Sequence, residues 1–289
     1  MSTVAVIAPN AESSPPHGQD RGVTSTADTA LRRAARLWFV TAVLGQWAFL
    51  YYLVAFYGPS TLTGNFQLWS RNRFLFKGYV AGDTAGNLAF AAHALLAAVI
   101  AFGGALQIVP QIRARALAFH RWNGRLFLVT AVGLSLSGLY MVWVRGANPS
   151  VVGKVSTSLN AVLILAFAAL AWRAALRRDV SVHRRWALRL YLMANAQWFI
   201  RVGVFAWFLL NRAVGVKAGF NGPFFYFADF ACYLLPLAVL ELYLYAQDKA
   251  GPGGRFAMAG GLVVLTALMA VGMFGFSMFS LSILAKGPA

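Results

Sequence analysis

Four polar side chains interrupt the long apolar runs of this chain, and they are the first candidates for a functional site. His93, Asn160, Arg201 and Asp229 each lie in a different run. An ionisable group inside a membrane-spanning segment is costly, and it is a candidate functional group by default. Arginine presents a planar fork of donors suited to a carboxylate or an anionic ligand, and histidine titrates near neutral pH. The four residues therefore predict a ligand-binding or ion-pair pocket for an anion or a proton.

The same residues also have simpler structural interpretations, which the sequence leaves open. Asp229 is the carboxylate at the depth of Arg201, so the two could form an ion pair that only locks their helices together. His93 could hydrogen-bond to a neighbouring helix. Asn160 and Gln46 could do the same, because such bonds stabilise helix contacts in membranes.

A second set of candidate residues is repeated at the start of two apolar runs. The two motifs are His120-Arg121-Trp122-Asn123-Gly124-Arg125 and His183-Arg184-Arg185-Trp186. One interpretation is an interfacial anchor, with tryptophan at headgroup depth and arginine on lipid phosphate. The other is a functional pair, in which His120 and His183 ligate a metal or a b-type haem, or relay protons.

Three functions fit these residues, and the sequence does not decide among them. The first is binding of a small ligand or cofactor in the polar pocket, with proton-coupled transport as one form of it. The second is a redox protein that holds haem b or a quinone. The third is a membrane assembly or scaffold subunit. Signatures of nucleotide-driven enzymes and of serine or zinc hydrolases are absent from the sequence, and whether the chain is an enzyme stays open.

The elements that must position these residues follow from the composition. The 289 residues are 60% hydrophobic and only 11% charged, whereas soluble chains have about 25% charged residues. So little charge cannot cover the surface of a water-soluble protein of this length. The single cysteine, Cys232, excludes an intrachain disulfide, and its apolar surroundings are typical of a small buried hydrophobe. The composition predicts an integral membrane protein.

Seven apolar runs are each close to the roughly 20 residues that a membrane-spanning helix needs. They are too long and too rich in leucine and alanine for the alternating strands of an outer-membrane barrel. Helices are then the remaining way to satisfy the backbone in lipid. The sequence predicts an all-α polytopic bundle with helices at about 36–57, 87–110, 123–144, 154–173, 187–210, 226–246 and 257–284.

The remaining segments give the domain organisation and the orientation. Residues 1–35 are rich in small and polar residues without an apolar period, which predicts a disordered tail before a transmembrane domain at 36–285. Of the 25 Lys and Arg residues, 16 lie in this tail and the even-numbered loops, and this bias places the N-terminus in the cytoplasm. The charge is divided among short loops against the bilayer, so anionic lipid headgroups are the expected partner and nucleic acid is not.

The motifs also resemble those of a bacterial family. The stretch from His93 through Gly103-Gly104 and Gln107 to the two His-Arg-Trp motifs and Arg201 is similar to the family catalogued as domain of unknown function 2306. The resemblance covers roughly residues 87–205 and implies a polytopic protein of the bacterial cytoplasmic (inner) membrane. It implies no known activity, substrate or cofactor.

Overall fold

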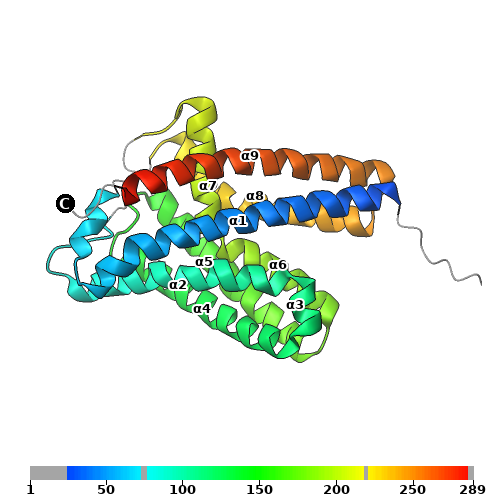
Figure 1. The fold of residues 1–289 in the computed structure, drawn as a ribbon, viewed down its shortest axis with the longest axis horizontal. Helices are drawn as coiled ribbons and strands as arrows, with labels where there is room; N and C mark the ends of the chain where they lie inside the picture. Colours follow the sequence, from blue (N-terminus) through cyan, green and yellow to red (C-terminus); the bar gives the residue numbers. More distant parts are fainter. Residues whose placement is uncertain (1–24, 73–76, 218–220, 286–289) are drawn as a thin grey trace, which may run out of the picture.

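The chain folds into an elongated bundle of α-helices (Figure 1). The computed structural model describes residues 25–72, 77–217 and 221–285. Within these ranges the chain forms nine α-helices and one short 3₁₀ helix, and its β contact is an isolated bridge between Lys217 and Asn221. Six of the helices are long and apolar enough to cross a membrane. The prediction of an all-α polytopic membrane protein is confirmed.

The helices follow the order of the predicted spans. They are α1 (Thr26–Leu62), the 3₁₀ helix η1 (Phe66–Arg71), α2 (Thr84–Ile108), α3 (Pro110–Arg115), α4 (Leu117–Trp143), α5 (Val151–Leu176), α6 (Val180–Ala194), α7 (Ala196–Asn211), α8 (Pro223–Asp248) and α9 (Pro252–Leu284). The six long apolar helices are α1, α2, α4, α5, α8 and α9, and α6 with α7 makes a bent seventh candidate span.

The first helix begins well before the predicted start at about residue 36. Ser25 caps it, because the backbone N–H of Asp28 donates to Ser25 Oγ at 3.1 Å and the backbone N–H of Ser25 donates to Asp28 Oδ2 at 3.3 Å. This reciprocal capping box satisfies two N–H groups that a helix start leaves unpaired. Of the predicted tail over residues 1–35, residues 1–24 lie outside the described residues, and residues 26–35 are helical.

The predicted single helix at 187–210 is wrong, because the structure has two helices there. The axes of α6 and α7 differ by 54° at a break on Asn195. Asn195 is buried, and its Nδ2 donates to the carbonyl of Tyr191 at 2.8 Å. A side chain that bonds to a carbonyl four residues earlier competes with the helix and bends it. The chain therefore changes direction inside the bundle without a proline or a glycine.

The bend gives the two halves of this segment different neighbours. Helix α6 packs on α5, whereas α7 packs on α9 and α8. The other helices pack in sequence, α1 against α2, α2 against α4 and α4 against α5, and α1 and α9 lie side by side (Figure 1). Gly272 makes the α7–α9 contact close, because a Cβ atom there would lie 2.1 Å from the carbonyl oxygen of Val202.

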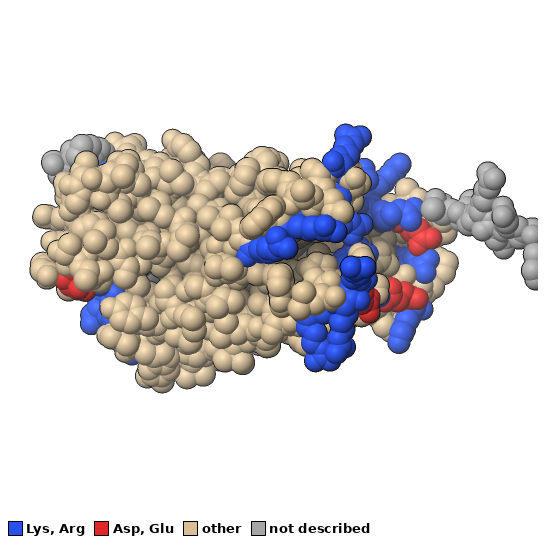
Figure 2. Space-filling model, turned by 90° about the horizontal axis from the view of Figure 1, so that it is seen from below, with Lys and Arg blue, Asp and Glu red and all other residues tan. Residues whose placement is uncertain are grey.

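Charged side chains gather at one end of the molecule. Figure 2 shows Lys and Arg clustered at the end where α1 begins, and few charges over the long apolar body. Three ion pairs at this end join neighbouring segments: Arg185 to Asp248 at 2.7 Å, Arg189 to Glu241 at 2.7 Å and Arg255 to Asp28 at 2.6 Å. The sequence bias in basic residues is thus a spatial bias along the long axis of the bundle.

Candidate functional site

A cavity of about 400 Å³ lies among the helices, and all four predicted pocket residues line it. His93 comes from α2, Asn160 from α5, Arg201 from α7 and Asp229 from α8. Helices α1, α4, α6 and α9 also contribute to the wall. The residues therefore meet in one space although they are up to 136 positions apart in the sequence.

The bend at Asn195 accounts for the position of this cavity. Because α6 packs on α5 and α7 packs on α9, the two halves diverge and leave a gap between α5 and α7. Ile100, Ala131 and Ile164 line the cavity near the middles of α2, α4 and α5. Asn72 and Asn148 line it from loops at the opposite end from the basic residues. The cavity thus extends from the middle of the bundle to its less basic end.

Arg201 does not form the ion pair that the sequence suggested. Among the residues that the structure describes, four ion pairs form, and none includes Arg201 or Asp229. Arg201 Nη1 donates to the carbonyl and to the side-chain oxygen of Gln197, one turn earlier, and its Cζ lies 4.9 Å from the centre of the Phe49 ring. The guanidinium is held by neutral groups, so its charge faces the cavity without a carboxylate.

Helices α5 and α8 each bring to the cavity an acceptor without a partner among the described residues. Asp229 Oδ2 and Asn160 Oδ1 are buried and accept no hydrogen bond from the described residues. The hydroxyl of Ser156 donates to the backbone carbonyl of Asp229 at 2.6 Å, and Asn160 Nδ2 donates to the carbonyl of Met193 at 3.3 Å. The Ser156 bond joins α5 to α8, the Asn160 bond joins α5 to α6, and Asn160 and Asp229 both line the cavity.

His93 occupies a third wall, between α2 and α4. Its Nδ1 lies 2.7 Å from Ser137 Oγ on α4. The ring also packs beside Gly138 of α4, where a Cβ would lie 3.7 Å from His93 Cε1, an ordinary van der Waals distance. His93 therefore does hydrogen-bond to a neighbouring helix, as one of the two interpretations predicted, and it also lines the cavity.

The rest of the lining is mostly apolar, and aromatic rings form part of it. On α1, Tyr52 stacks on Phe56 with ring centroids 5.4 Å apart. Phe276 of α9 meets Tyr52 edge-on at 5.7 Å, and Phe205 of α7 meets Phe276 at 5.8 Å. Edge and offset contacts of this kind fix ring orientation beyond simple area burial. The cavity therefore combines a few polar groups with rigid apolar walls.

The sequence analysis missed a buried arginine at the less basic end. Arg145 is 7% exposed and donates four hydrogen bonds: to Asp83 Oδ2 at 2.5 Å, to Asn87 Oδ1 at 2.6 Å, and to the carbonyls of Gly78 and Lys77 at 3.0 and 3.1 Å. It thereby holds the loop before α2 against the end of α4. Arg145 lies just after an apolar run, where charged loop residues are common. The sequence therefore did not indicate that its side chain is buried and clamps the loop before α2 to the end of α4.

The two His-Arg-Trp motifs fold alike at the basic end. Arg125 Cζ lies 4.9 Å above the ring of Trp122, and Arg189 Cζ lies 4.7 Å above that of Trp186, three residues apart in both cases. Such cation–π contacts suit an interfacial anchor. Arg189 also pairs with Glu241 through two bonds of 2.7 and 2.8 Å.

The histidines of these motifs do not line the cavity. His183 Nδ1 lies 2.9 Å from the carbonyl of Ala171, and His120 Nδ1 is buried without a partner. The suggestion that His120 and His183 hold haem or a metal stays a prediction. In the loop before His183, Asp179 caps α6, and the backbone N–H of Val182 and the hydroxyl of Ser181 lower the pKa of its carboxyl.

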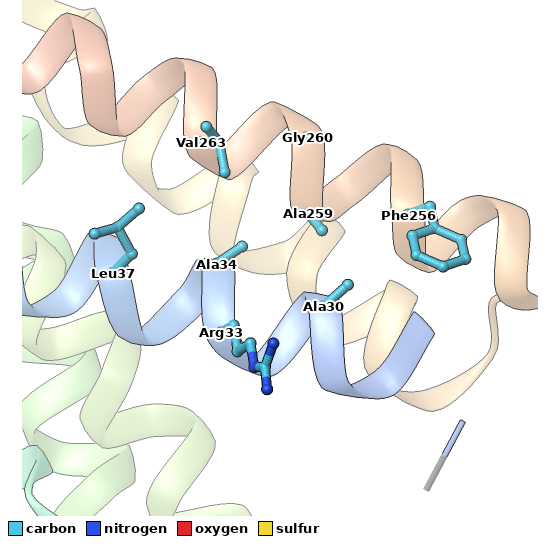
Figure 3. A pocket seen from close by; sticks show the side chains of 8 residues that line it. All are labelled: Ala30, Arg33, Ala34, Leu37, Phe256, Ala259, Gly260 and Val263. Atoms are coloured by element: carbon cyan, nitrogen blue, oxygen red, sulfur yellow. The ribbon is translucent and has the colours of Figure 1, made fainter. Parts of the chain in front are cut away.

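A second hollow lies between α1 and α9 close to the basic end (Figure 3). Small residues on both helices, Ala30, Ala34, Ala259 and Gly260, leave it open, and Arg33 is its one charged residue among those described. None of the predicted site residues lines this hollow. The polar cavity is therefore the stronger candidate site.

Comparison with known proteins supports the resemblance that the motifs suggested. No curated protein and no solved structure matches the chain. A family model does match one segment of the chain, which runs from α2 through α7. This segment includes His93, Asn160, Arg201 and both His-Arg-Trp motifs, whereas Asp229 lies beyond it. Over residues 90–221 the chain matches the family described as "Predicted membrane protein (DUF2306)", which confirms the predicted resemblance.

Proposed function

We propose that this membrane protein binds a small ligand in the cavity among its helices, and that the ligand enters from the less basic end. The observation that carries the proposal is a set of polar groups in the cavity lining that the described residues leave unsatisfied. Among these residues Arg201 pairs with no carboxylate, and Asp229 Oδ2 and Asn160 Oδ1 accept no hydrogen bond. Buried polar groups are normally paired. Polar groups that line a cavity without a protein partner can instead hydrogen-bond to a ligand, or to water that a ligand displaces.

The size and lining of the cavity support the same proposal. Small-molecule sites usually have volumes of about 300–1,000 Å³, with mostly apolar walls and a few polar groups that orient the ligand. The cavity of about 400 Å³ has this character, with aromatic rings from α1, α7 and α9 in its lining and the Phe49 ring against Arg201. A small organic molecule fits this description better than a bare ion.

The broken span favours transport as the role of this binding. Discontinuous helices at the binding site are typical of secondary transporters, because helix ends at membrane depth can interact with a solute. The α6–α7 break lies beside the cavity, which Ala194 and Ala196 line from either side of Asn195. We infer that a proton accompanies the solute, with His93 and Asp229 as the titratable groups on the path.

We further propose the setting in which this occurs. The protein spans the bacterial cytoplasmic membrane with its N-terminus and its basic end in the cytoplasm, where Lys and Arg contact anionic headgroups. The clustering of basic residues in Figure 2 supports this orientation. The cavity would then open on the external side.

Cys232 offers a direct test, because it is the single cysteine of the chain and lines the cavity. A charged, membrane-impermeant methanethiosulfonate reagent reacts with thiols in water and not with thiols in lipid. We expect it to label Cys232 from outside in intact cells or right-side-out vesicles. Small molecules that occupy the cavity should slow the labelling.

The matched control is a cysteine at a lipid-facing position. Val264 on α9 is 60% exposed on the apolar body, so the double variant Cys232→Ala/Val264→Cys should resist the same reagent while reacting with an uncharged, membrane-permeant maleimide. If Cys232 in the unchanged protein is as unreactive as this control, the cavity is closed to water and the proposed function fails.

A further inference from the structure

We infer that the ligand is a small zwitterion, with an anionic group that binds Arg201 and an amine that binds Asp229 and Asn160. The inference rests on the proposed function and names the chemical class of its ligand. Its basis is the separation of charge and hydrogen-bonding capacity across the cavity: a donor wall formed by α1 and α7, and an acceptor wall formed by α5 and α8.

The donor wall selects an anion. Arg201 uses Nη1 for Gln197, and no hydrogen bond from its Nε or Nη2 to the described residues is found. An arginine fork with two such N–H groups matches a carboxylate in a bidentate arrangement. The Phe49 ring beneath the guanidinium fixes the plane of the fork. The wall thus presents positive charge and donors, with its orientation already set.

The acceptor wall selects a cation or an N–H donor. Asp229 Oδ2 and Asn160 Oδ1 both lack donors. The hydrogen bonds of Ser156 and Asn160 hold the backbones and side chains of this wall in place. A carboxylate oxygen and an amide oxygen that line one cavity without donors suit an ammonium group, which carries three donors and no acceptor. A simple anion would leave both oxygens unsatisfied and add a repulsive charge.

The two walls do not neutralise each other. Arg201 and Asp229 belong to α7 and α8, which pack together, yet they form no ion pair. Gln197 and Phe49 hold the arginine toward α1 instead. One molecule that carries both charges would satisfy both residues with no net charge added to a low-dielectric site, where unpaired charges are costly. The aromatic residues between the walls would contact its apolar body.

Three compounds with one skeleton test the inference: phenylalanine, 2-phenylethylamine, which lacks the carboxylate, and 3-phenylpropanoate, which lacks the amine. The readout is protection of Cys232 against the charged thiol reagent, with each variant normalised to its own rate without compound. We expect phenylalanine to protect at a concentration at least about tenfold lower than either analogue, the factor that corresponds to 1.4 kcal/mol.

Two charge-removing variants identify the residue behind each preference. Arg201→Gln should abolish the advantage of phenylalanine over 2-phenylethylamine, and Asp229→Asn should abolish its advantage over 3-phenylpropanoate. Arg201→Lys and Asp229→Glu keep the charges and serve as matched controls that should retain part of each preference. Circular dichroism of each purified variant checks that the bundle is folded.

The outcomes separate this inference from the proposed function. If Cys232 reacts but 3-phenylpropanoate protects as well as phenylalanine, the ligand is a plain anion and the zwitterion inference is overturned. Equal protection by the amine overturns it in the same way, and so does a reactive Cys232 that none of the three compounds protects. An unreactive Cys232 instead refutes the water-accessible cavity itself.

Discussion

Arg145 illustrates how much a single charged side chain can contribute in a protein with few charges. It is almost fully buried and bonds to Asp83, to Asn87 and to two backbone carbonyls of the loop before α2. The side chain of Asp83 is 42% exposed, so solvent weakens the ion pair itself. The three bonds to neutral acceptors are better shielded and hold the loop in position against the end of α4.

Removing this side chain should destabilise the protein measurably. We expect Arg145→Ala to lower the free energy of unfolding by about 3 kcal/mol, because it leaves buried acceptors without donors. Thermal unfolding in mild detergent, followed by tryptophan fluorescence, measures the change.

The matched control is Arg115→Ala, an arginine truncation at an exposed site, which should stay within about 0.5 kcal/mol of the unchanged protein. Arg145→Lys should be intermediate, because lysine keeps the charge but not the planar fork. Equal unfolding midpoints for Arg145→Ala and Arg115→Ala would contradict the clamp.

At the scale of helices, close contacts depend on glycines whose neighbours the sequence does not reveal. Gly272 and Gly261 both lie in α9, yet a Cβ at Gly272 would meet the Val202 carbonyl at 2.1 Å, whereas a Cβ at Gly261 would meet nothing within 4 Å. We expect Gly272→Ala to cost about 1–3 kcal/mol through overpacking. Gly261→Ala should be neutral or stabilising by up to about 1 kcal/mol.

The same unfolding measurement compares these two variants in parallel. A cost at Gly261 equal to that at Gly272 would show that the close approach of α7 to α9 does not determine the effect. A neutral Gly272→Ala would show that the two helices can separate without loss of stability.

The α6–α7 bend makes a further prediction at this scale. Alanine favours a continuous helix over asparagine by about 0.7 kcal/mol, and Asn195→Ala also removes the bond to the Tyr191 carbonyl, which contributes about 1 kcal/mol. Together these favour a straighter segment by about 15- to 20-fold. Because α7 would then lie closer to α5, labelling of Cys232 by the charged reagent should slow by about this factor. Labelling at the original rate would mean that packing, and not Asn195, sets the bend.

The helices could be predicted from sequence to different degrees. The long apolar runs coincide with the six helices that are long and apolar enough to cross a membrane and with the bent α6–α7 pair, because lipid allows little else. The bend was not predicted, because apolar residues continue through 187–210 and no proline or glycine interrupts them; Asn195 and Gln197 were the available signals. The suggested ion pair between Arg201 and Asp229 does not form, for a related reason. The position of a residue along its helix predicts its depth in the membrane. It does not reveal that Gln197, one turn before Arg201, already accepts hydrogen bonds from the guanidinium.

At the scale of the whole molecule, the distribution of basic residues predicts the orientation in the membrane. We expect the α1–η1 connection to face outward and the α3–α4 connection to face the cytoplasm. In a Cys232→Ala background, Thr63→Cys should react with an impermeant thiol reagent in intact cells. Ala116→Cys should react only after the membrane is permeabilised. Both positions are exposed, so differences in burial do not explain a contrast, and the reverse pattern would invert the topology.

The length of α1 and α9 has a consequence for how this protein responds to solvent. Their 37 and 33 residues correspond to about 55 and 50 Å at 1.5 Å per residue, whereas the hydrocarbon core of a bilayer is only about 30 Å thick. With the basic end at the headgroups, the start of α1 and the adjoining ends of α8 and α9 project into water. Their contacts form a small core of their own, made of Leu31, Ala34, Ala246, Ala259 and Leu262. The projecting segment is stabilised by apolar burial in water, as a soluble domain is. Urea should therefore unfold it while the lipid-embedded helices stay folded.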